Sequence, residues 1–215
     1  MISSLQYITQ DHSDYSHFEL VKQAVDAGVD WVQLRIKNVS DDVFLQEALK
    51  CREYTLKHGV KLIINDQVKI AKQVSADGVH VGQDDMPINE VRDLLGDKFI
   101  IGGTANTLDQ IMTHVQNGAD YVGVGPFRFT KTKDKLSPIL GLEGYDQIIK
   151  TLKINQVDIP VIAIGGIELS DIESIKETGV HGIAVSGLIT HSENQKELIN
   201  SINKALSNGI IENCG

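Results

Sequence analysis

The chain has little cysteine: Cys51 and Cys214 are the only two among its 215 residues. Cys51 falls within a stretch of helical period and Cys214 within the last residues, so the pair does not resemble the disulfide framework of a small secreted domain. The first residues also lack the basic start and the apolar stretch of a secretion signal. We therefore expect a protein that works in the reducing environment of the cytoplasm.

Positive charge is also scarce, because 20 lysines and arginines stand against 29 acidic residues and give a formal net charge of −9. A protein that makes broad contact with nucleic acid needs a dense cationic surface, so the net charge argues against this class, although it does not exclude a local basic pocket. Apolar runs long enough to span a bilayer are missing too, and the runs present have the length of strands. We expect small molecules as partners, rather than nucleic acid or a membrane.

What the chain does have is an ordinary globular composition, with 41% hydrophobic and 23% charged residues. Its length suits one domain with a large core and is short for two domains. No linker or low-complexity segment interrupts the sequence. The sequence therefore predicts a single domain over residues 1–215, with a short C-terminal tail after about residue 207.

Apolar, β-branched runs alternate with amphipathic segments of helical period, and the alternation repeats eight times. Eight evenly spaced units with short, almost continuously apolar strands favour a single closed (β/α)8 TIM barrel. The alternative is an open doubly wound sheet, because the same alternation could also lie flat. The expected strands are residues 5–9, 31–35, 61–65, 78–82, 99–103, 121–125, 161–165 and 182–186. The helical segments between them include residues 18–27, 41–57, 89–95, 108–117 and 172–178.

Several of these helical segments end in a tripeptide with a central glycine. A glycine at this place can adopt the left-handed conformation that ends a helix, after which the chain enters the next strand. Each tripeptide therefore predicts a junction between a helix and a strand. The four glycines are Gly28, Gly59, Gly118 and Gly179.

Polar residues follow the predicted strands, at the end of the barrel where such enzymes act. After the second strand, Gln33, Arg35 and Lys37 alternate with two apolar residues, so their side chains share one direction. If that direction is inwards, one strand end supplies an amide and two cations to a single anion. A solvated strand end is the alternative for cations in isolation. The polar residues at the other strand ends favour a site.

Acidic residues follow the third and fourth strands, as Asn65-Asp66 and Asp84-Asp85. Carboxylates from neighbouring strand ends suit Mg²⁺, which keeps several waters and bridges to the phosphates of a substrate. Helix capping is the alternative for Asp66 and Asp85, because both precede helical segments. Capping explains one acid after each strand, but neither the adjacent Asn65 nor the second acid. We therefore favour a metal site, with both metal binding and helix capping left open for Asp84.

Three segments have the composition of phosphate-binding loops. The long connection 126–142 is rich in Lys, Thr and Ser, and its residues 130–133 (Thr-Lys-Thr-Lys) offer hydroxyls, amides and cations to phosphate oxygens. Gly165-Gly166 and Ser186-Gly187 follow the seventh and eighth strands, where barrels often bind a phosphate. Each signal is weak alone, but their register with the last two strands makes a phosphate subsite the expectation.

Zinc-dependent hydrolysis and catalysis by a serine triad are poorly supported. The seven histidines do not cluster or show helical metal spacing, and no serine lies in a nucleophile elbow. His80 lies inside an apolar strand, so we expect it to be a hydrogen-bonded core or mouth residue rather than a metal ligand.

With these residues in view, the chain closely resembles the thiamine phosphate synthase family, which shares its barrel with the thiazole tautomerases. The resemblance runs from about Tyr7 to Ile189, nearly the whole domain, and its ordered motifs are highly specific for this superfamily. The motifs are VQLRIK at 32–37, LIIND at 62–66, ADGVHVGQDD at 76–85, ADYVGVGP at 119–126, TKTK at 130–133 and PVIAIGGI at 160–167.

The resemblance implies a Mg²⁺-dependent transferase of a pyrimidinylmethyl group. Its reaction joins 4-amino-2-methyl-5-hydroxymethylpyrimidine diphosphate to 4-methyl-5-(2-phosphoethyl)thiazole, or to the carboxylate form of that thiazole, and releases diphosphate and thiamine phosphate. A dissociative pathway is expected, because the aminopyrimidine can delocalise the cation that the leaving diphosphate creates. No protein nucleophile is then needed.

Carried over residue by residue, the resemblance also implies the site residues. It assigns Asp66 and Asp85 to Mg²⁺, and it makes Lys133, Arg35 and Thr104 the expected catalytic residues. The pyrimidine diphosphate is assigned to Gln33, Arg35, Lys37, Asn65, Thr104 and Lys133. The thiazole phosphate is assigned to Thr130, Thr132, Gly166, Val185, Ser186 and Gly187.

Three residues depart from the family's pattern: Ile36 replaces a glutamate, Thr104 a serine and Asn106 a histidine. In the tautomerase branch that histidine is the expected acid–base group, and an amide cannot shuttle protons at neutral pH, so Asn106 counts against a tautomerase. A catalytically silent regulatory barrel is less favoured, because the metal carboxylates and the diphosphate cations are all present. A sugar-phosphate isomerase is a more distant alternative, because its chemistry needs neither Asn65-Asp66 nor the run Gln83-Asp84-Asp85. The sequence leaves the oligomeric state open, a homo-oligomer included.

Overall fold

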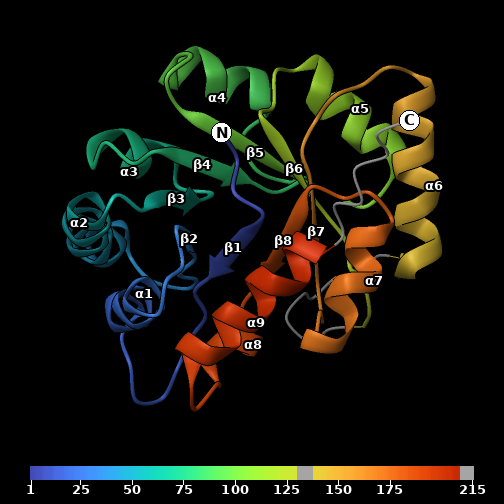
Figure 1. Cartoon of the computed structure of the whole chain (residues 1–215). Coiled ribbons are helices and arrows are strands. Elements are labelled where there is room, and N and C mark those ends of the chain that lie inside the picture. Colours follow the sequence, from blue (N-terminus) through green and yellow to red (C-terminus); the bar gives the residue numbers. More distant parts are fainter. Residues whose placement is uncertain (130–137, 209–215) are drawn as a thin grey trace.

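The computed structural model describes residues 1–129 and 138–208, and its centre is a closed barrel of eight parallel strands (Figure 1). Each strand pairs with the next along the chain, and β1 also pairs with β8, with Leu5 opposite Ile183. This closure confirms the predicted barrel and excludes the open doubly wound sheet. The strands are β1 (Leu5–Ile8), β2 (Trp31–Leu34), β3 (Lys61–Asn65), β4 (Gly78–Val81), β5 (Ile100–Ala105), β6 (Tyr121–Val124), β7 (Val161–Ile164) and β8 (Gly182–Val185).

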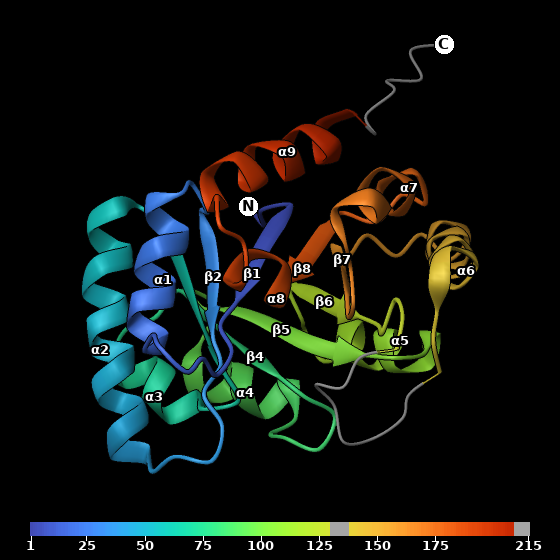
Figure 2. The same cartoon turned by 90° about the horizontal axis from the view of Figure 1, so that it is seen from below.

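Helices lie around the outside of the barrel, as Figures 1 and 2 show from two directions. The five helical segments named from the sequence are found with ends shifted by at most one residue. None of the described helices combines the length and the apolarity that crossing a membrane requires. The helices are α1 (His17–Asp26), α2 (Asp41–His58), α3 (Val68–Gln73), α4 (Ile88–Leu95), α5 (Leu108–Gln116), α6 (Gly141–Ile154), η1 (Leu169–Asp171), α7 (Ile172–Glu177), α8 (Gly187–Thr190) and α9 (Gln195–Asn208).

The helix ends follow from local sequence signals. At the start of α1 the Ser16 side chain accepts the Glu19 N–H, and the Glu19 carboxylate accepts the Ser16 N–H at 2.7 Å, which satisfies two otherwise unpaired donors. At the other ends, the four predicted glycines adopt positive φ angles, which confirms the expected helix-to-strand junctions. The angles are 109° at Gly28, 68° at Gly59, 84° at Gly118 and 92° at Gly179.

Two apolar layers form the core, because side chains on each strand alternate between the helices and the barrel interior. The larger layer packs between sheet and helices. The smaller one lies in the barrel interior and includes Trp31 and Tyr121 at the beginning of β2 and β6, whose rings meet edge to face with centroids 5.0 Å apart. Apolar side chains therefore fill the barrel interior, and the inward-pointing side chains at the C-terminal ends of the strands line its open end, the mouth.

The long connection after β6 returns to its own start. The Leu140 N–H donates to the Pro126 carbonyl at 3.0 Å, and the Phe127 N–H donates to the Ile164 carbonyl at the end of β7 at 2.9 Å. The two described ends of this connection therefore lie together at the mouth of the barrel. Between them, residues 130–137 lie outside the described residues, and with them the predicted site residues Thr130, Thr132 and Lys133.

Candidate active site

A chain of polar side chains crosses the inside of the barrel. Gln33 Nε2 lies 3.1 Å from Gln6 Oε1, and Gln6 Nε2 lies 3.4 Å from the Tyr121 hydroxyl. That hydroxyl lies 3.0 Å from His80 Nδ1, and His80 Nε2 lies 2.9 Å from the Thr104 hydroxyl. The period-two alternation of five strands produces this chain, because each of the five side chains is one that its strand directs inwards.

The direction of these hydrogen bonds follows from the two amides at the start of the chain. Gln33 and Gln6 donate from their nitrogens, so the Tyr121 oxygen accepts from Gln6 and its own proton is left for His80 Nδ1. His80 then carries its proton on Nε2, which donates to Thr104. Burial raises the pKa of Tyr121, so its hydroxyl stays protonated. Consequently the Gln33 carbonyl oxygen can accept from a ligand, and the Thr104 hydroxyl can donate to one.

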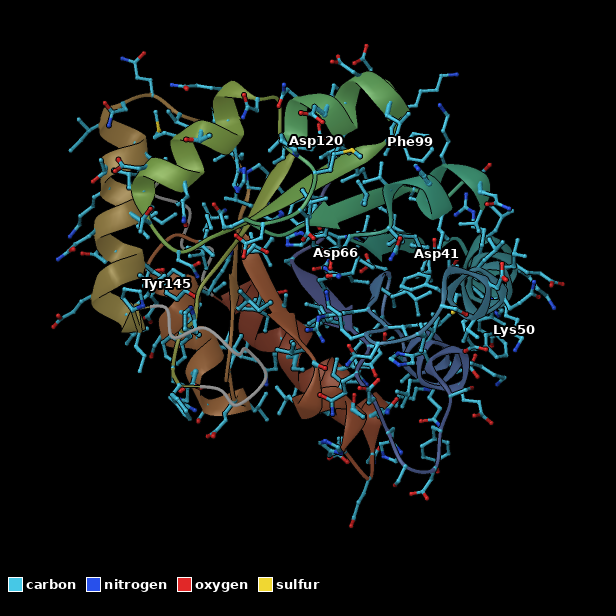
Figure 3. All side chains as sticks on the ribbon, turned by 180° about the vertical axis from the view of Figure 1, so that it is seen from behind. Asp41, Lys50, Asp66, Phe99, Asp120 and Tyr145 are labelled. Carbon is cyan, nitrogen blue, oxygen red and sulfur yellow. The ribbon has the colours of Figure 1, made fainter. Side chains whose placement is uncertain are left out.

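A cation and two carboxylates meet at the ends of β2, β3 and β4. The Lys37 ammonium contacts Asp66, and Asp85 accepts the Gly82 N–H at 2.8 Å. Asp66 has a φ angle of 60°, a left-handed conformation that aspartate tolerates better than most residues and that tends to be retained at functional sites. Figure 3 shows Asp66 near the middle of the barrel, whereas Lys50 of α2 lies at the periphery.

The capping alternative is wrong for both aspartates. The residues at the N-cap positions of α3 and α4 are Gln67 and Pro87, and neither helix start has a side-chain capping bond. Instead, the two carboxyl groups interact with each other. Partial desolvation of Asp85, followed by its hydrogen bond with Asp66, raises the pKa of the Asp85 carboxyl. Two acids whose charges repel in this way form a site that attracts a cation.

The donor set of this pair fits Mg²⁺. Mg²⁺ takes one or two carboxylates from a protein and completes its shell with waters and substrate phosphates. Within residues 1–129 and 138–208 there is no group of three or more His, Cys, Asp or Glu side chains that could hold a metal, so a site closed by protein ligands is not present there. The Lys37 ammonium on Asp66 already shows that positive charge is stabilised at this place.

A cavity of about 320 Å³ opens at the ends of β1, β2, β7 and β8. Its wall includes Gly165 and Gly166, whose φ angles of 102° and 68° require glycine, as expected for a backbone that a ligand approaches closely. A Cβ on Gly166 would lie 2.5 Å from Arg128 Cγ. Arg35 also lines the cavity, and its guanidinium makes no hydrogen bond or ion pair with another described residue. Among the described residues, the cavity therefore offers the Arg35 guanidinium and close backbone approach to an anion.

The structure brings most of the predicted site residues to one mouth, because all strands of a parallel barrel end on the same side. Arg35, which the resemblance assigns to the pyrimidine diphosphate, lines the cavity among residues that the resemblance assigns to the thiazole phosphate. Lys133, Thr130 and Thr132 lie outside the described residues. The residues at the ends of β2 to β5 are Gln33, Lys37, Asn65, Asp66, Asp85 and Thr104, and those at the cavity are Arg35, Gly166, Val185, Ser186 and Gly187.

Sequence reasoning missed three residues of this mouth. Gln6 and Tyr121 belong to the buried chain, and Gln10 lines the cavity. A signal existed for Gln6, because it is the one polar residue in the apolar run of β1. Gln10 also carried a signal, because it follows the end of a strand, as Arg35 does. Tyr121 carried no signal, since a tyrosine at the start of a buried strand is usually part of the core.

Comparison with known proteins gives a consistent result. The family model described as thiamine monophosphate synthase matches residues 5–189. A thiamine-phosphate synthase of Flavobacterium johnsoniae is 49% identical, covering 98% of this chain and 100% of the relative, and one of Phocaeicola vulgatus is 48% identical, covering 88% and 91%. The solved structure of a thiamine phosphate pyrophosphorylase from Pyrococcus furiosus superposes with a TM-score of 0.85 at 29% identity, covering 96% of each chain.

Proposed function

Because the chain belongs to the thiamine monophosphate synthase family, we propose that it joins 4-amino-2-methyl-5-hydroxymethylpyrimidine diphosphate to 4-methyl-5-(2-phosphoethyl)thiazole, or to the carboxylate form of that thiazole. The products are thiamine phosphate and diphosphate, and the chain is a transferase of thiamine biosynthesis. The observation that carries the choice of substrates is that two different polar environments share one mouth. One is the group of Lys37, Asp66 and Asp85, and the other is the glycine-lined cavity that contains Arg35.

The first environment suits the diphosphate. Asp66 and Asp85 would hold Mg²⁺, which supplies positive charge that neutralises the diphosphate oxygens. Lys37 and Asn65, at the ends of β2 and β3, belong to the same subsite, and we assign Lys133 to it as well. Their positive charge and hydrogen-bond donors stabilise a leaving group whose negative charge grows as the bond breaks, so they favour the transition state over the bound substrate.

The buried chain suits the pyrimidine half of this substrate. The Gln33 carbonyl oxygen is directed to accept a hydrogen bond, which an exocyclic amino group can donate. The Thr104 hydroxyl is directed to donate, which suits either a ring nitrogen or a diphosphate oxygen. Because the hydrogen-bonded side chains from Gln33 to Thr104 are buried or partly buried and each has a defined donor or acceptor role, the Gln33 and Thr104 groups are oriented before the substrate arrives.

We propose a dissociative reaction. The bond between the pyrimidine methylene carbon and the diphosphate oxygen breaks, and both electrons leave with the diphosphate. The aminopyrimidine delocalises the positive charge that remains on the methylene carbon. The thiazole nitrogen then donates its lone pair to that carbon and forms the new C–N bond. No step transfers a proton or needs a nucleophile from the protein, so Arg35, Thr104 and Lys133 act by electrostatic stabilisation and orientation.

The thiazole phosphate suits the cavity at β7 and β8, with Gly166, Val185, Ser186 and Gly187 on its wall, and we add Thr130 and Thr132 to this subsite. A tautomerase remains disfavoured, because the Asn106 amide donates to the Gly125 carbonyl and offers no titratable group for proton transfer. The predicted cytoplasmic location, the extent of the domain and the oligomeric state stay predictions.

One experiment tests the proposed function. The purified chain is incubated with both substrates, with Mg²⁺ and then with excess chelator, and thiamine phosphate is measured by chromatography. We expect product with Mg²⁺ and a loss of most of the rate with chelator. Full activity in chelator would refute the metal role, and thiazole tautomerisation without thiamine phosphate would move the chain to the tautomerase branch.

A further inference from the structure

Three hydrogen-bonded side chains lead from the cavity wall to the surface, and two of them have no role in the reaction described so far. Ser186 Oγ lies 2.9 Å from Gln10 Oε1, and Gln10 Nε2 lies 2.8 Å from His191 Nε2. Ser186 and Gln10 line the cavity from the ends of β8 and β1, whereas His191 follows α8 and is exposed. The cavity wall is thus connected to solvent through an amide and an imidazole.

The direction of these hydrogen bonds is determined by the amide. Its nitrogen can only donate and its oxygen can only accept, so His191 Nε2 accepts from Gln10 and the Ser186 hydroxyl donates to Gln10. A serine has one proton, so in this arrangement Ser186 offers only lone pairs to the cavity. The oxygens of an ionised phosphate are also acceptors. Ser186 and a phosphate would therefore meet as two acceptors.

We propose that Gln10 is a positioning residue whose amide turns over when a phosphate enters the cavity, and so converts Ser186 from an acceptor into a donor. After the turn, Gln10 Nε2 donates to Ser186 Oγ, and the Ser186 hydroxyl donates to the phosphate. Gln10 Oε1 then accepts from His191 Nε2, because either ring nitrogen of a histidine can carry the proton. The identity of the phosphate, a thiazole phosphate ester, rests on the function proposed above.

The surroundings permit this turn. Gly187 lies next to the amide without a side chain, and even a Cβ there would be at an ordinary 3.7 Å from Gln10 Oε1. The ring of His12 lies near His191, with centroids 5.9 Å apart, and His12 Nδ1 accepts the Asp14 N–H at 3.1 Å. Among the described residues His191 makes no ion pair, so neither its hydrogen bond with Gln10 nor its contact with the His12 ring fixes its tautomer.

Two variants of Gln10 separate this role from a structural one. The Gln10→Glu carboxylate can only accept, so it holds the Ser186 hydroxyl and keeps it from the phosphate. The Gln10→Met side chain has a similar size and no hydrogen bonds, so Ser186 is free to donate to the phosphate. For the thiazole phosphate, measured by calorimetry, we expect Gln10→Glu to raise Kd by about thirtyfold, and Gln10→Met to change it by about threefold or less.

A double-mutant cycle removes the contribution of charge repulsion. On a Ser186→Ala background, Gln10→Glu should raise Kd by only about threefold, because the hydroxyl through which Gln10 acts is gone. Equal factors on both backgrounds would mean that the new carboxylate merely repels the phosphate, and would overturn the proposal. A Gln10→Met variant that binds as weakly as Gln10→Glu would also overturn it, since Gln10 would then only hold the β1 loop against α8.

Steady-state kinetics give a second readout that a loosened fold would not mimic. Gln10→Glu should raise the KM for the thiazole phosphate by a similar factor, and leave kcat and the KM for the pyrimidine diphosphate within about threefold of wild type. If the wild type binds the thiazole phosphate but forms no thiamine phosphate, the proposed function fails while the binding test of Gln10 stands. If the wild type binds no thiazole phosphate at all, the role proposed for Gln10 is refuted directly.

Discussion

Replacing Asp85 by asparagine should stabilise the metal-free protein and abolish most of its activity. The substitution preserves shape: an asparagine oxygen can still accept the Gly82 N–H that Asp85 accepts at 2.8 Å, and its amide can donate to Asp66. What it removes is a negative charge beside another one. A residue retained despite a cost to stability is expected where carboxylates are arranged to bind a cation.

The magnitude follows from the charges at the site. Two unit charges 4 Å apart repel by about 1 kcal/mol in water and by about 4 kcal/mol at an effective dielectric constant near 20. The exposure of Asp85 and the Lys37 ammonium on Asp66 place this pair at the lower end. We therefore expect Asp85→Asn to increase the free energy of unfolding by about 1 kcal/mol at pH 7.5, or about 2–4 °C in Tm for a chain of this length.

The gain should depend on pH in a defined direction. Partial desolvation and the hydrogen bond with Asp66 raise the pKa of Asp85 in the folded state above its ordinary value of 3.8. Below pH 3.8 Asp85 therefore does not lower the free energy of unfolding of the wild type. The loss of stability develops as the pH rises from 3.8 to the folded-state pKa, and it is complete above that pKa. The advantage of Asp85→Asn should be full at pH 7.5 and should disappear as the pH falls towards 3.8.

Thermal unfolding with chelator and with Mg²⁺, together with product formation, tests this reasoning. Mg²⁺ should raise the Tm of the wild type but not that of Asp85→Asn, and turnover should fall by about a hundredfold. Asp93→Asn, which removes the same charge from the exposed side of α4, is the matched control and should change neither quantity appreciably. A variant less stable than wild type in chelator would refute the repulsion, and wild-type turnover would refute the metal role.

Three further substitutions test other parts of the mouth. Tyr121→Phe leaves Gln6 and His80 without their shared partner and should lower the free energy of unfolding by about 2–3 kcal/mol in denaturant titrations; unchanged stability would contradict the buried chain. Lys133→Ala should slow turnover by about a hundredfold, because the lysine is assigned to the leaving diphosphate; a change confined to the thiazole KM would contradict that assignment. Asn106→His should keep synthase activity within about tenfold, and tautomerisation by the wild type in a direct assay would refute the choice between the two branches.

The strands and the positions of the mouth residues could be predicted because both depend on local patterns. A run such as 61–65 is apolar on both faces and ends in Asn65-Asp66, so the strand and the polar residues at its end are visible within a few residues. The closure of the barrel was also predictable, since eight similar units of this length leave few alternatives. The five helical segments named from the sequence were found with ends within one residue of those expected.

The partners of those polar residues were decided only by the tertiary structure. Ser186 and Gln10 are 176 residues apart, and Gln10 and His191 are 181 apart, so nothing in the local sequence relates them until β1 pairs with β8. Whether Asp66 caps a helix likewise depended on the backbone, whose left-handed turn directs the carboxylate to Lys37 instead of a helix start. The physical reason is that the pattern of apolar residues within one segment indicates which side chains are buried. A hydrogen bond or an ion pair depends instead on which distant segments the closure of the barrel brings within about 3 Å of each other.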